Sequence, residues 1–272
     1  MSNREQLFEV EDLRVIYRRP GEKPVEAVRG VSFTLAAGET LGIVGESGSG
    51  KSTIAKTLML LQPAAGGAVR FRGQDIFSFS SSARRAYRHE VQMVFQDAVG
   101  SLNPRMTVRQ TLDEICTRAA ALSASGRPHR PPEELLDLVG LSKAVLEQYP
   151  RELSGGQCQR VSIARALAVD PKVLVADEPV SALDVSVQAR ILNLLRELRR
   201  DLGLSVLLIA HDLAVVRNVC DRVCVMHLGL FEDAGQAEDV FANPRSDYTK
   251  SLLAAVPDVT RSLAARSAPV SP

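Results

Sequence analysis

The chain has 272 residues, of which 45% are hydrophobic and 24% are charged. That length allows one large domain or two small ones, and the composition is ordinary for a protein that buries a sizeable core. Lys plus Arg number 33 against 32 for Asp plus Glu, so the net charge of +1 gives no bulk electrostatic reason to bind nucleic acid or an acidic membrane surface.

No stretch of the sequence approaches the run of about 20 apolar residues that a bilayer-spanning helix needs. The N-terminus, MSNREQLFEVED, has no apolar stretch of the kind that a secretory signal requires, so we expect a cytoplasmic chain. The four cysteines, Cys116, Cys158, Cys220 and Cys224, form no C-x-x-C pair, although the last two would share a helix face if that segment is helical. They are expected to be buried thiols in a reducing compartment and not metal ligands.

The first part of the chain is predicted to consist mainly of strands. The expected strands are 7–17, 27–35, 40–44, 69–72 and 91–95. A loop that contains Pro and Gly, at 18–24, separates the first two strands, and a helix at 54–61 follows the third. The Ser-rich stretch 78–82 is expected to be a surface loop.

The later part of the chain favours helices and helix-flanked strands. Residues 108–151 favour helix, with a polar, Pro-rich loop at 123–132. Strands at 173–176 and 205–210 are each followed by a helix. Strand–helix alternation implies an α/β fold, with a mainly parallel sheet and helices on both faces. The segment at about 100–165 is expected to be a helical insertion into that fold.

A glycine-rich loop follows the predicted strand at 40–44. Its residues are Gly45, Glu46, Ser47, Gly48, Ser49, Gly50, Lys51 and Ser52, and they match GxxxxGK(S/T) between a strand and a helix. The glycines let successive N–H groups point at phosphate oxygens, and the helix N-terminus adds a positive dipole end. Lys51 is expected to reach the β and γ phosphates, Ser52 to coordinate Mg²⁺, and Thr53 to belong to the same site. An accidental Lys-Ser after a glycine turn is the alternative.

Two adjacent carboxylates end the apolar strand in VLVADEP, at 173–179. Asp177 is placed to hold Mg²⁺, directly or through its water shell. Glu178 is the candidate general base for the water that attacks the γ-phosphate. A solvated turn is the alternative for such a pair taken alone.

A second glycine motif occurs in LSGGQCQRVSIARAL, at 153–167. Ser154, Gly155, Gly156 and Gln157 open a predicted helix and offer a further set of phosphate-seeking N–H groups. A serine cap followed by a glycine turn is the alternative. Because one nucleotide does not need two cradles from one chain, we expect this cradle to serve the nucleotide of a neighbouring subunit.

With these motifs the sequence resembles the ABC-transporter ATPase family, in which LSGGQ is the signature. The resemblance covers about residues 7–257, with the motifs in the family order, and implies one ATPase domain of that extent. The implied fold is a P-loop NTPase core with a mainly parallel sheet, an N-terminal antiparallel β region and a helical insertion subdomain. Residues 258–272, rich in Ser, Ala, Arg and Pro, are expected to be a disordered tail.

The resemblance also implies roles for residues that are weak signals by themselves. In the family two ATPase subunits face each other head to tail, and ATP lies between the glycine loop of one and the signature of the other. Tyr17 matches the aromatic residue that stacks on adenine. Gln96 matches the glutamine that contacts Mg²⁺ or the lytic water and links the ATP state to the membrane partner. The loop 181–184 matches the one that crosses the dimer interface, and His211 matches the histidine that contacts the γ-phosphate.

Two segments, at 96–108 and 248–257, are similar to the branch that takes up peptides or nickel. That branch implies a second, different ATPase subunit, two membrane-spanning subunits and an extracytoplasmic solute-binding protein. The chain would then lie at the cytoplasmic face of the inner membrane. Ala98, Cys158 and the segment 227–231 depart from the branch pattern, and no Cys follows Cys224, so no C-terminal iron–sulfur centre is expected.

Two other functions remain open for such an ATPase. One is a soluble ABC ATPase of DNA repair or translation, and the other is the ATPase of an exporter. A single domain with a compact helical insert and a near-neutral charge argues against the first, so no nucleic-acid partner is expected.

Overall fold

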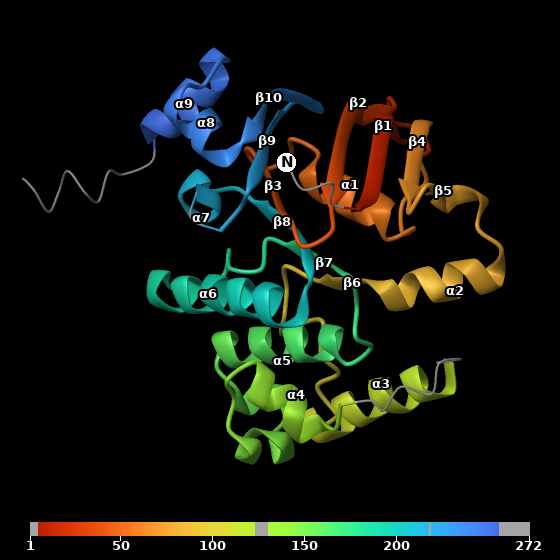
Figure 1. Cartoon of the computed structure of the whole chain (residues 1–272), viewed down its shortest axis with the longest axis vertical. Helices are drawn as coiled ribbons and strands as arrows, with labels where there is room; N and C mark the ends of the chain where they lie inside the picture. Colours follow the sequence, from red (N-terminus) through yellow and green to blue (C-terminus); the bar gives the residue numbers. More distant parts are fainter. Residues whose placement is uncertain (1–4, 123–129, 218, 256–272) are drawn as a thin grey trace, which may run out of the picture.

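The computed structural model describes residues 5–122, 130–217 and 219–255, and its strands form two sheets (Figure 1). The first sheet is antiparallel, in the order β2 (Val25–Ala36), β1 (Gln6–Tyr17), β4 (Gly66–Phe71) and β5 (Gln74–Asp75). The second has six strands, in the order β10 (Leu230–Gln236), β9 (Arg222–His227), β3 (Thr40–Val44), β8 (Ser205–Ala210), β7 (Val173–Asp177) and β6 (Val91–Val94). All neighbours in the second sheet pair in parallel except β9 and β10.

The central strands of the six-stranded sheet are covered on both faces. Every residue of β3, β7 and β8 is buried, which explains why these segments are continuous apolar runs without alternation. Along β7, Leu174 and Ala176 join one hydrophobic core, while Val173 and Val175 join another. The sheet therefore separates two cores and is the rigid platform of the molecule.

Helices from two parts of the chain fill these cores. With the antiparallel sheet, α1 (Lys51–Leu58) packs in one core. The opposite core contains α6 (Val185–Leu202), α7 (Leu213–Arg217) and α8 (Ala237–Ala242), together with α3 (Val108–Leu122), α4 (Pro132–Leu138) and α5 (Gly155–Leu167). In Figure 1, α3, α4 and α5 lie below α6, at the end of the molecule away from the antiparallel sheet. Short 3₁₀ turns at Lys143–Glu147 and Pro150–Glu152 connect α4 to α5.

The structure corrects some of the expected elements. The Ser-rich stretch 78–82 is not only a loop, because α2 (Ser81–Glu90) begins inside it, with Ser80 accepting a hydrogen bond from the Ala83 N–H as its N-cap. The helix after the glycine loop begins at Lys51, three residues earlier than expected. Cys224 lies on β9, so it does not share a helix face with Cys220. The expected tail at 258–272 and most of the expected loop at 123–132 lie outside the described residues.

None of the helices among the described residues is long and apolar enough to cross a membrane. In the same part of the chain, no group of three or more His, Cys, Asp or Glu side chains is arranged to hold a metal ion.

Candidate active site

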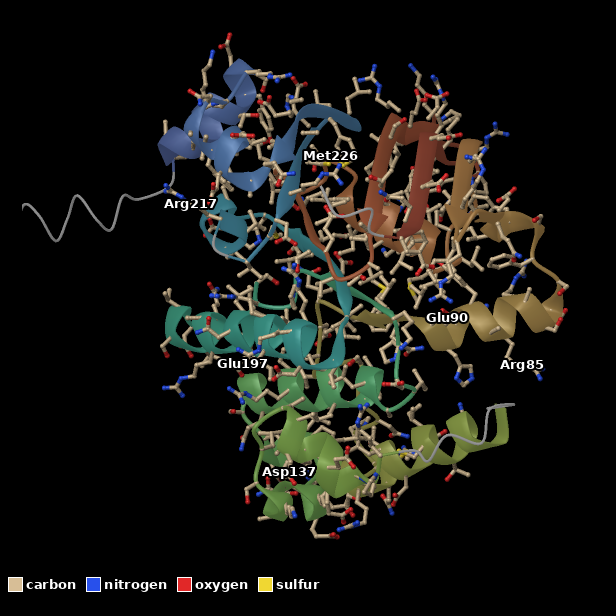
Figure 2. The ribbon with its side chains drawn as sticks, in the orientation of Figure 1. Arg85, Glu90, Asp137, Glu197, Arg217 and Met226 are labelled. Carbon is tan, nitrogen blue, oxygen red and sulfur yellow. The ribbon has the colours of Figure 1, made fainter. Side chains whose placement is uncertain are left out.

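The glycine loop lies at the carboxyl end of β3, and two of its glycines are required by close backbone approaches. Gly45 has φ +151°, and a Cβ there would lie 2.0 Å from the carbonyl oxygen of Met226, which is labelled in Figure 2. Gly50 has φ +112°, and its Cβ would lie 2.3 Å from the Ala27 carbonyl oxygen. No L side chain fits at either position without moving backbone, so the loop is held tightly between β9 and β2.

The N-terminus of α1 opens directly out of this loop. Gly50 is its N-cap residue, and no side chain caps the first turn. Ser47 and Gly48 are exposed, while Ser49 is buried and its hydroxyl has no hydrogen-bond partner among the described residues. Uncapped N–H groups at a helix start, preceded by a glycine loop, form a site suited to an anion such as phosphate.

Lys51 brings a buried positive charge into this loop. Its side chain is only 3% exposed, and Nζ donates to the carbonyl oxygens of Gly45 at 2.8 Å and Glu46 at 2.7 Å. Burial lowers the pKa of the ammonium group, while the carboxylates of Glu178, Asp177 and Glu46 oppose that shift. A buried ammonium held mainly by neutral carbonyl groups can gain strongly from a phosphate oxygen.

Ser52 and Asp177 meet at the bottom of the loop. The Ser52 hydroxyl donates to Asp177 Oδ1 at 2.8 Å. Burial raises the pKa of Asp177, the hydrogen bond from Ser52 lowers it, and the nearby Glu178 raises it again. A hydroxyl and a carboxylate, both oxygen donors, form a ligand pair of the kind that Mg²⁺ takes beside phosphates, so these residues fit that ion.

Three polar side chains meet at the ends of three adjacent strands. Gln96 follows β6, Glu178 follows β7 and His211 follows β8. Gln96 Nε2 donates to Glu178 Oε2 at 2.8 Å, and His211 Nδ1 lies 3.7 Å from the same oxygen. Gln96 Nε2 also lies 3.4 Å from the Ser181 hydroxyl. Because carboxyl ends of parallel strands share one sheet edge, the register of β6, β7 and β8 assembles this cluster.

Tyr17 ends β1 near the start of α1. Its hydroxyl lies 3.3 Å from the Thr53 hydroxyl, so the structure brings this predicted aromatic to the side of the glycine loop. Thr53 itself is 9% exposed.

The signature residues form a separate feature at the start of α5. The Ser154 hydroxyl accepts from the Gln157 N–H at 3.3 Å, and Gln157 Oε1 accepts from the Ser154 N–H at 2.9 Å, which is a capping box. Ser154 and Gly155 are exposed. A Cβ on Gly155 or Gly156 would meet Leu183 or Val187, residues that follow Glu178 in the chain and do not belong to the glycine loop. The start of α5 is thus packed against other residues than those of the glycine loop.

The sequence patterns did not identify one contact of the glycine loop. The Tyr248 hydroxyl accepts a hydrogen bond from the Glu46 N–H at 3.2 Å, across 202 residues of chain. The Tyr248 ring also stacks on His227, with ring centroids 3.9 Å apart. In the sequence Tyr248 is noticeable only as part of the segment 248–257, which is similar to the uptake branch. No local pattern marks it as a neighbour of the loop.

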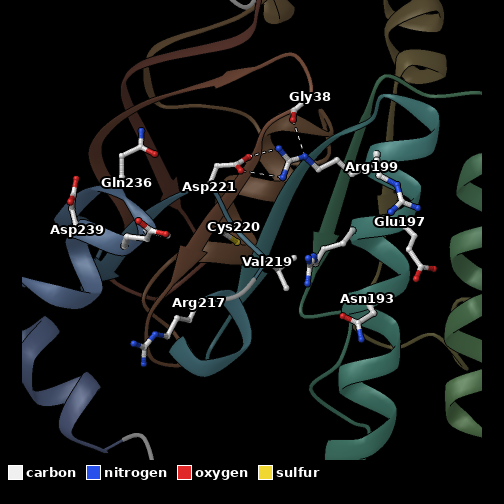
Figure 3. A pocket seen from close by; sticks show the side chains of 14 residues that line it. Gly38, Asn193, Glu197, Arg199, Arg217, Val219, Cys220, Asp221, Gln236 and Asp239 are labelled. Carbon is white, nitrogen blue, oxygen red and sulfur yellow. Dashed lines mark hydrogen bonds and ion pairs between the residues drawn. The ribbon is translucent and has the colours of Figure 1, made fainter. Parts of the chain in front are cut away.

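A hollow of about 1110 Å³ lies away from the glycine loop, between α6, α7 and α8 (Figure 3). Its wall includes Arg199, which donates to the Gly38 carbonyl oxygen at 2.8 Å and pairs with Asp221 at 2.7 Å. Gly38 precedes β3 and Asp221 precedes β9, so the hollow is at the amino ends of these strands. It contains none of the predicted site residues.

Comparison with known proteins gives consistent matches. A family model described as ABC transporter matches residues 28–181. The oligopeptide transport ATP-binding protein OppF of Lactococcus lactis subsp. lactis is 47% identical over 94% of this chain and 82% of its own length. The oligopeptide transport ATP-binding protein AppF of Bacillus subtilis is 45% identical over 96% and 80%.

Solved structures match the fold as well. A dimeric ATP-binding cassette, bound to ADP and Pi in a post-hydrolysis state, has a TM-score of 0.73 and 27% identity, covering 85% of this chain and 99% of that one. The cbiO1 protein of Clostridium perfringens, part of the ABC transporter complex cbiONQ, has a TM-score of 0.74 and 26% identity over 96% and 99%. The chain belongs to the ABC transporter family, as an ATP-binding protein and ATPase of that family.

Proposed function

We propose that this chain, with residues 7–257 as one ATPase domain, powers a transporter that takes up oligopeptides. The observation that carries the ATPase chemistry is the meeting of Gln96, Glu178 and His211 at one sheet edge, beside Lys51 and Ser52. The curated relatives named for oligopeptide transport support the solute class, since they match nearly the whole chain at 45–47% identity. Nickel is the second candidate solute, and only the likeness to the uptake branch supports it.

The nucleotide-binding roles follow from the loop geometry. Loop N–H groups between Ser47 and Ser52 and the ammonium of Lys51 bind the phosphates, and Tyr17 stacks on the adenine. Ser52, Asp177 and the Gln96 amide oxygen would hold Mg²⁺, which would neutralise charge on the phosphates. The amide nitrogen of Gln96 is bonded to Glu178, so its oxygen remains an acceptor for the cation or for water.

The hydrolytic roles belong to the strand-end cluster. Glu178 Oε2 accepts the proton of the attacking water, and Gln96 orients that carboxylate through its 2.8 Å hydrogen bond. His211, 52% exposed and adjacent to the same carboxylate, donates toward the γ-phosphate. An exposed ring on this side can reach a phosphate that enters from solvent.

The signature serves the nucleotide of a second ATPase subunit, which is a different chain. Two observations support a partner surface here. Ser154 and Gly155 are exposed at the start of α5, and Val185, next to the loop 181–184, is 82% exposed although it is apolar. An exposed apolar residue beside an uncovered phosphate cradle is suited to contact with another subunit.

The membrane-spanning subunits bind next to Gln96. A mainly apolar groove of about 700 Å³ lies there, lined by Met59, Leu61, Phe95 and Ile115 among others. Leu61 is 59% exposed and Phe95 40% exposed. A helix from a membrane-spanning subunit fits such a groove, which would keep the chain at the cytoplasmic face of the inner membrane. An extracytoplasmic binding protein would deliver the solute.

The ATPase roles are tested by three variants of the full chain. Glu178→Gln should reduce hydrolysis by about 10²–10⁴-fold with ATP binding retained. Lys51→Ala should bind ATP far more weakly, and removal of Mg²⁺ with a chelator should stop wild-type hydrolysis. Glu197→Gln, the same chemical change at an exposed position on α6 (labelled in Figure 2), is the matched control and should hydrolyse ATP normally. Full turnover by Glu178→Gln would remove Glu178 from the base role.

The transport role requires the assembled complex. The chain should co-purify with two membrane-spanning subunits and a second ATPase, and the complex in vesicles should accumulate oligopeptides when ATP is supplied on the side of this chain. ATP-driven movement in the opposite direction would identify an exporter instead. Accumulation of Ni²⁺ without accumulation of peptides would contradict the solute class.

A further inference from the structure

A single peptide group of the glycine loop is bonded on both sides. The carbonyl oxygen of Gly45 accepts from Lys51 Nζ at 2.8 Å. The N–H of the same peptide, which belongs to Glu46, donates to the Tyr248 hydroxyl at 3.2 Å. Because a peptide group is planar and rigid, the hydrogen bond to Tyr248 restricts the direction in which the carbonyl faces Lys51.

Tyr248 is itself held firmly. It lies on α9 (Asp247–Ala255), which contacts β10. The N–H of Ser246, just before α9, donates to Asp233 Oδ2 at 3.0 Å, and Asp233 is on β10 and 6% exposed. The Tyr248 ring lies nearly parallel to His227, with 16° between the ring planes.

The β9–β10 hairpin that supports Tyr248 also contacts the loop directly. The N–H of Gly229, in its turn, donates to the Ser49 carbonyl oxygen at 2.9 Å. Met226, near the end of β9, places its carbonyl oxygen against Gly45. The hairpin pairs through β9 with β3, the strand that leads into the loop, and contacts α9 through β10 (Figure 1). The loop is therefore supported from behind by a late segment of the chain, and Tyr248 is a side chain of that segment that hydrogen-bonds to the loop.

We infer that Tyr248 is a positioning residue for the phosphate-binding loop. Its hydroxyl holds the Gly45–Glu46 peptide, and that peptide holds Lys51 in place until a phosphate oxygen replaces the carbonyl as its partner. This inference rests on the proposed role of Lys51 as a phosphate ligand. The Tyr248 hydroxyl bonds to the backbone of the loop and not to Lys51 or Glu178, so it acts through the loop.

The consequence is a better-ordered loop when ATP arrives. With the peptide fixed from behind, the loop N–H groups keep their direction while Lys51 exchanges its carbonyl partners for phosphate. Without the hydroxyl the peptide can rotate, and the free-energy cost of ordering it then weakens ATP binding. The loss of one such hydrogen bond corresponds to about a two- to tenfold weaker affinity.

Tyr248→Phe tests the inference, since it removes the hydroxyl and keeps the ring on His227. In the full chain, the Kd and KM for ATP should rise about two- to tenfold, while kcat at saturating ATP stays unchanged, because Glu178 is held by other elements. The matched control is Tyr87→Phe, which also removes a hydroxyl bonded to backbone, here the Leu58 carbonyl at the other end of α1. It should lower the melting temperature without changing the Kd for ATP.

The outcomes separate this inference from the proposed function. Wild-type chain that fails to bind ATP would contradict the function itself. Wild-type binding that is lost in Lys51→Ala but unchanged in Tyr248→Phe would overturn the role of Tyr248 alone. An equal rise in Kd for Tyr87→Phe, or a fall in kcat with unchanged Kd for Tyr248→Phe, would overturn it too.

Discussion

Replacing Gly156 by Ala should separate the signature helix from its neighbour. An ideal Cβ at position 156 would lie 2.7 Å from Val187 Cγ1, where ordinary contacts are 3.4–4 Å. Val187 is β-branched and lies in the first turn of α6, so it has one strongly preferred side-chain rotamer and cannot easily turn aside. The starts of α5 and α6 must therefore move apart by several tenths of an ångström.

The cost can be compared with overpacking in protein cores, which destabilises by about 1–3 kcal/mol. Each kcal/mol shifts the melting temperature of a domain of this size by roughly 2–4 °C. Ala favours helix over Gly by about 1 kcal/mol, which leaves a net loss of up to about 2 kcal/mol, so we expect Gly156→Ala to melt up to about 8 °C below wild type. Thermal unfolding of the full chain without nucleotide, followed by circular dichroism, measures the shift.

Gly155→Ala is the matched control, one residue earlier in the same turn. Its Cβ would meet only Leu183 Cδ2 at 3.3 Å, at the far end of a side chain that can rotate. That variant should melt within about 2 °C of wild type, because the helix preference of Ala offsets the tight contact. Val187→Ala combined with Gly156→Ala should recover part of the loss. Equal melting temperatures for the two single variants would refute the steric argument.

Three further outcomes follow from other contacts. Asp177 is 5% exposed, and burial raises its pKa above the ordinary value of 3.8. Between the unfolded and the folded pKa the folded state binds more protons, so stability falls as pH rises through that window. Asp177→Asn should therefore melt higher than wild type at pH 7 and lose the advantage below pH 3.8, and equal melting curves at both pH values would contradict this. Arg199→Met breaks bonds to the Gly38 carbonyl and to Asp221 at a half-buried site and should destabilise by about 1–3 kcal/mol, whereas Arg200→Met, which loses only an exposed pair with its neighbour in sequence, should unfold in urea like wild type. Ser154→Arg should leave ATP affinity of the isolated chain unchanged and prevent ATP-dependent dimerisation with the partner ATPase subunit in size-exclusion chromatography; lost affinity in the monomer would place the signature at the chain's own nucleotide.

Four strands of the six-stranded sheet, β3, β6, β7 and β8, were predictable because burial leaves a direct mark on sequence, whereas β9 and β10 were not among the expected strands. In β3 every residue is buried, and the expected bounds 40–44 agree with the structure. The helix α2 was missed for the opposite reason. Only Tyr87 of its ten residues is buried, so no apolar period marks it, and its capping serine lies in a run of serines that favours a loop equally well.

The candidate site was predictable where spacing along the chain encodes it. The glycine loop and the pair Asp177 and Glu178 each follow a buried strand, and the sheet brings them together. The contact between Tyr248 and Glu46 could not be predicted, because 202 residues separate them and a hydroxyl–backbone bond has no sequence pattern. The backbone conformation of Glu178 was equally hidden, since Glu is not a residue type that indicates positive φ.

That conformation has a practical consequence for engineering. Glu178 has φ +46°, a left-handed backbone that costs a residue with a Cβ about 1–2 kcal/mol. Two hydrogen bonds hold Glu178 in this conformation. Its N–H donates to the Ile209 carbonyl oxygen at 3.0 Å, and its carbonyl oxygen accepts from the Ser181 hydroxyl at 3.2 Å. Glycine would adopt the same backbone without strain and would lack the carboxylate. A library selected only for heat resistance will therefore favour glycine at position 178, which lacks the carboxylate proposed as the general base, so thermostable variants of this chain have to be screened for turnover.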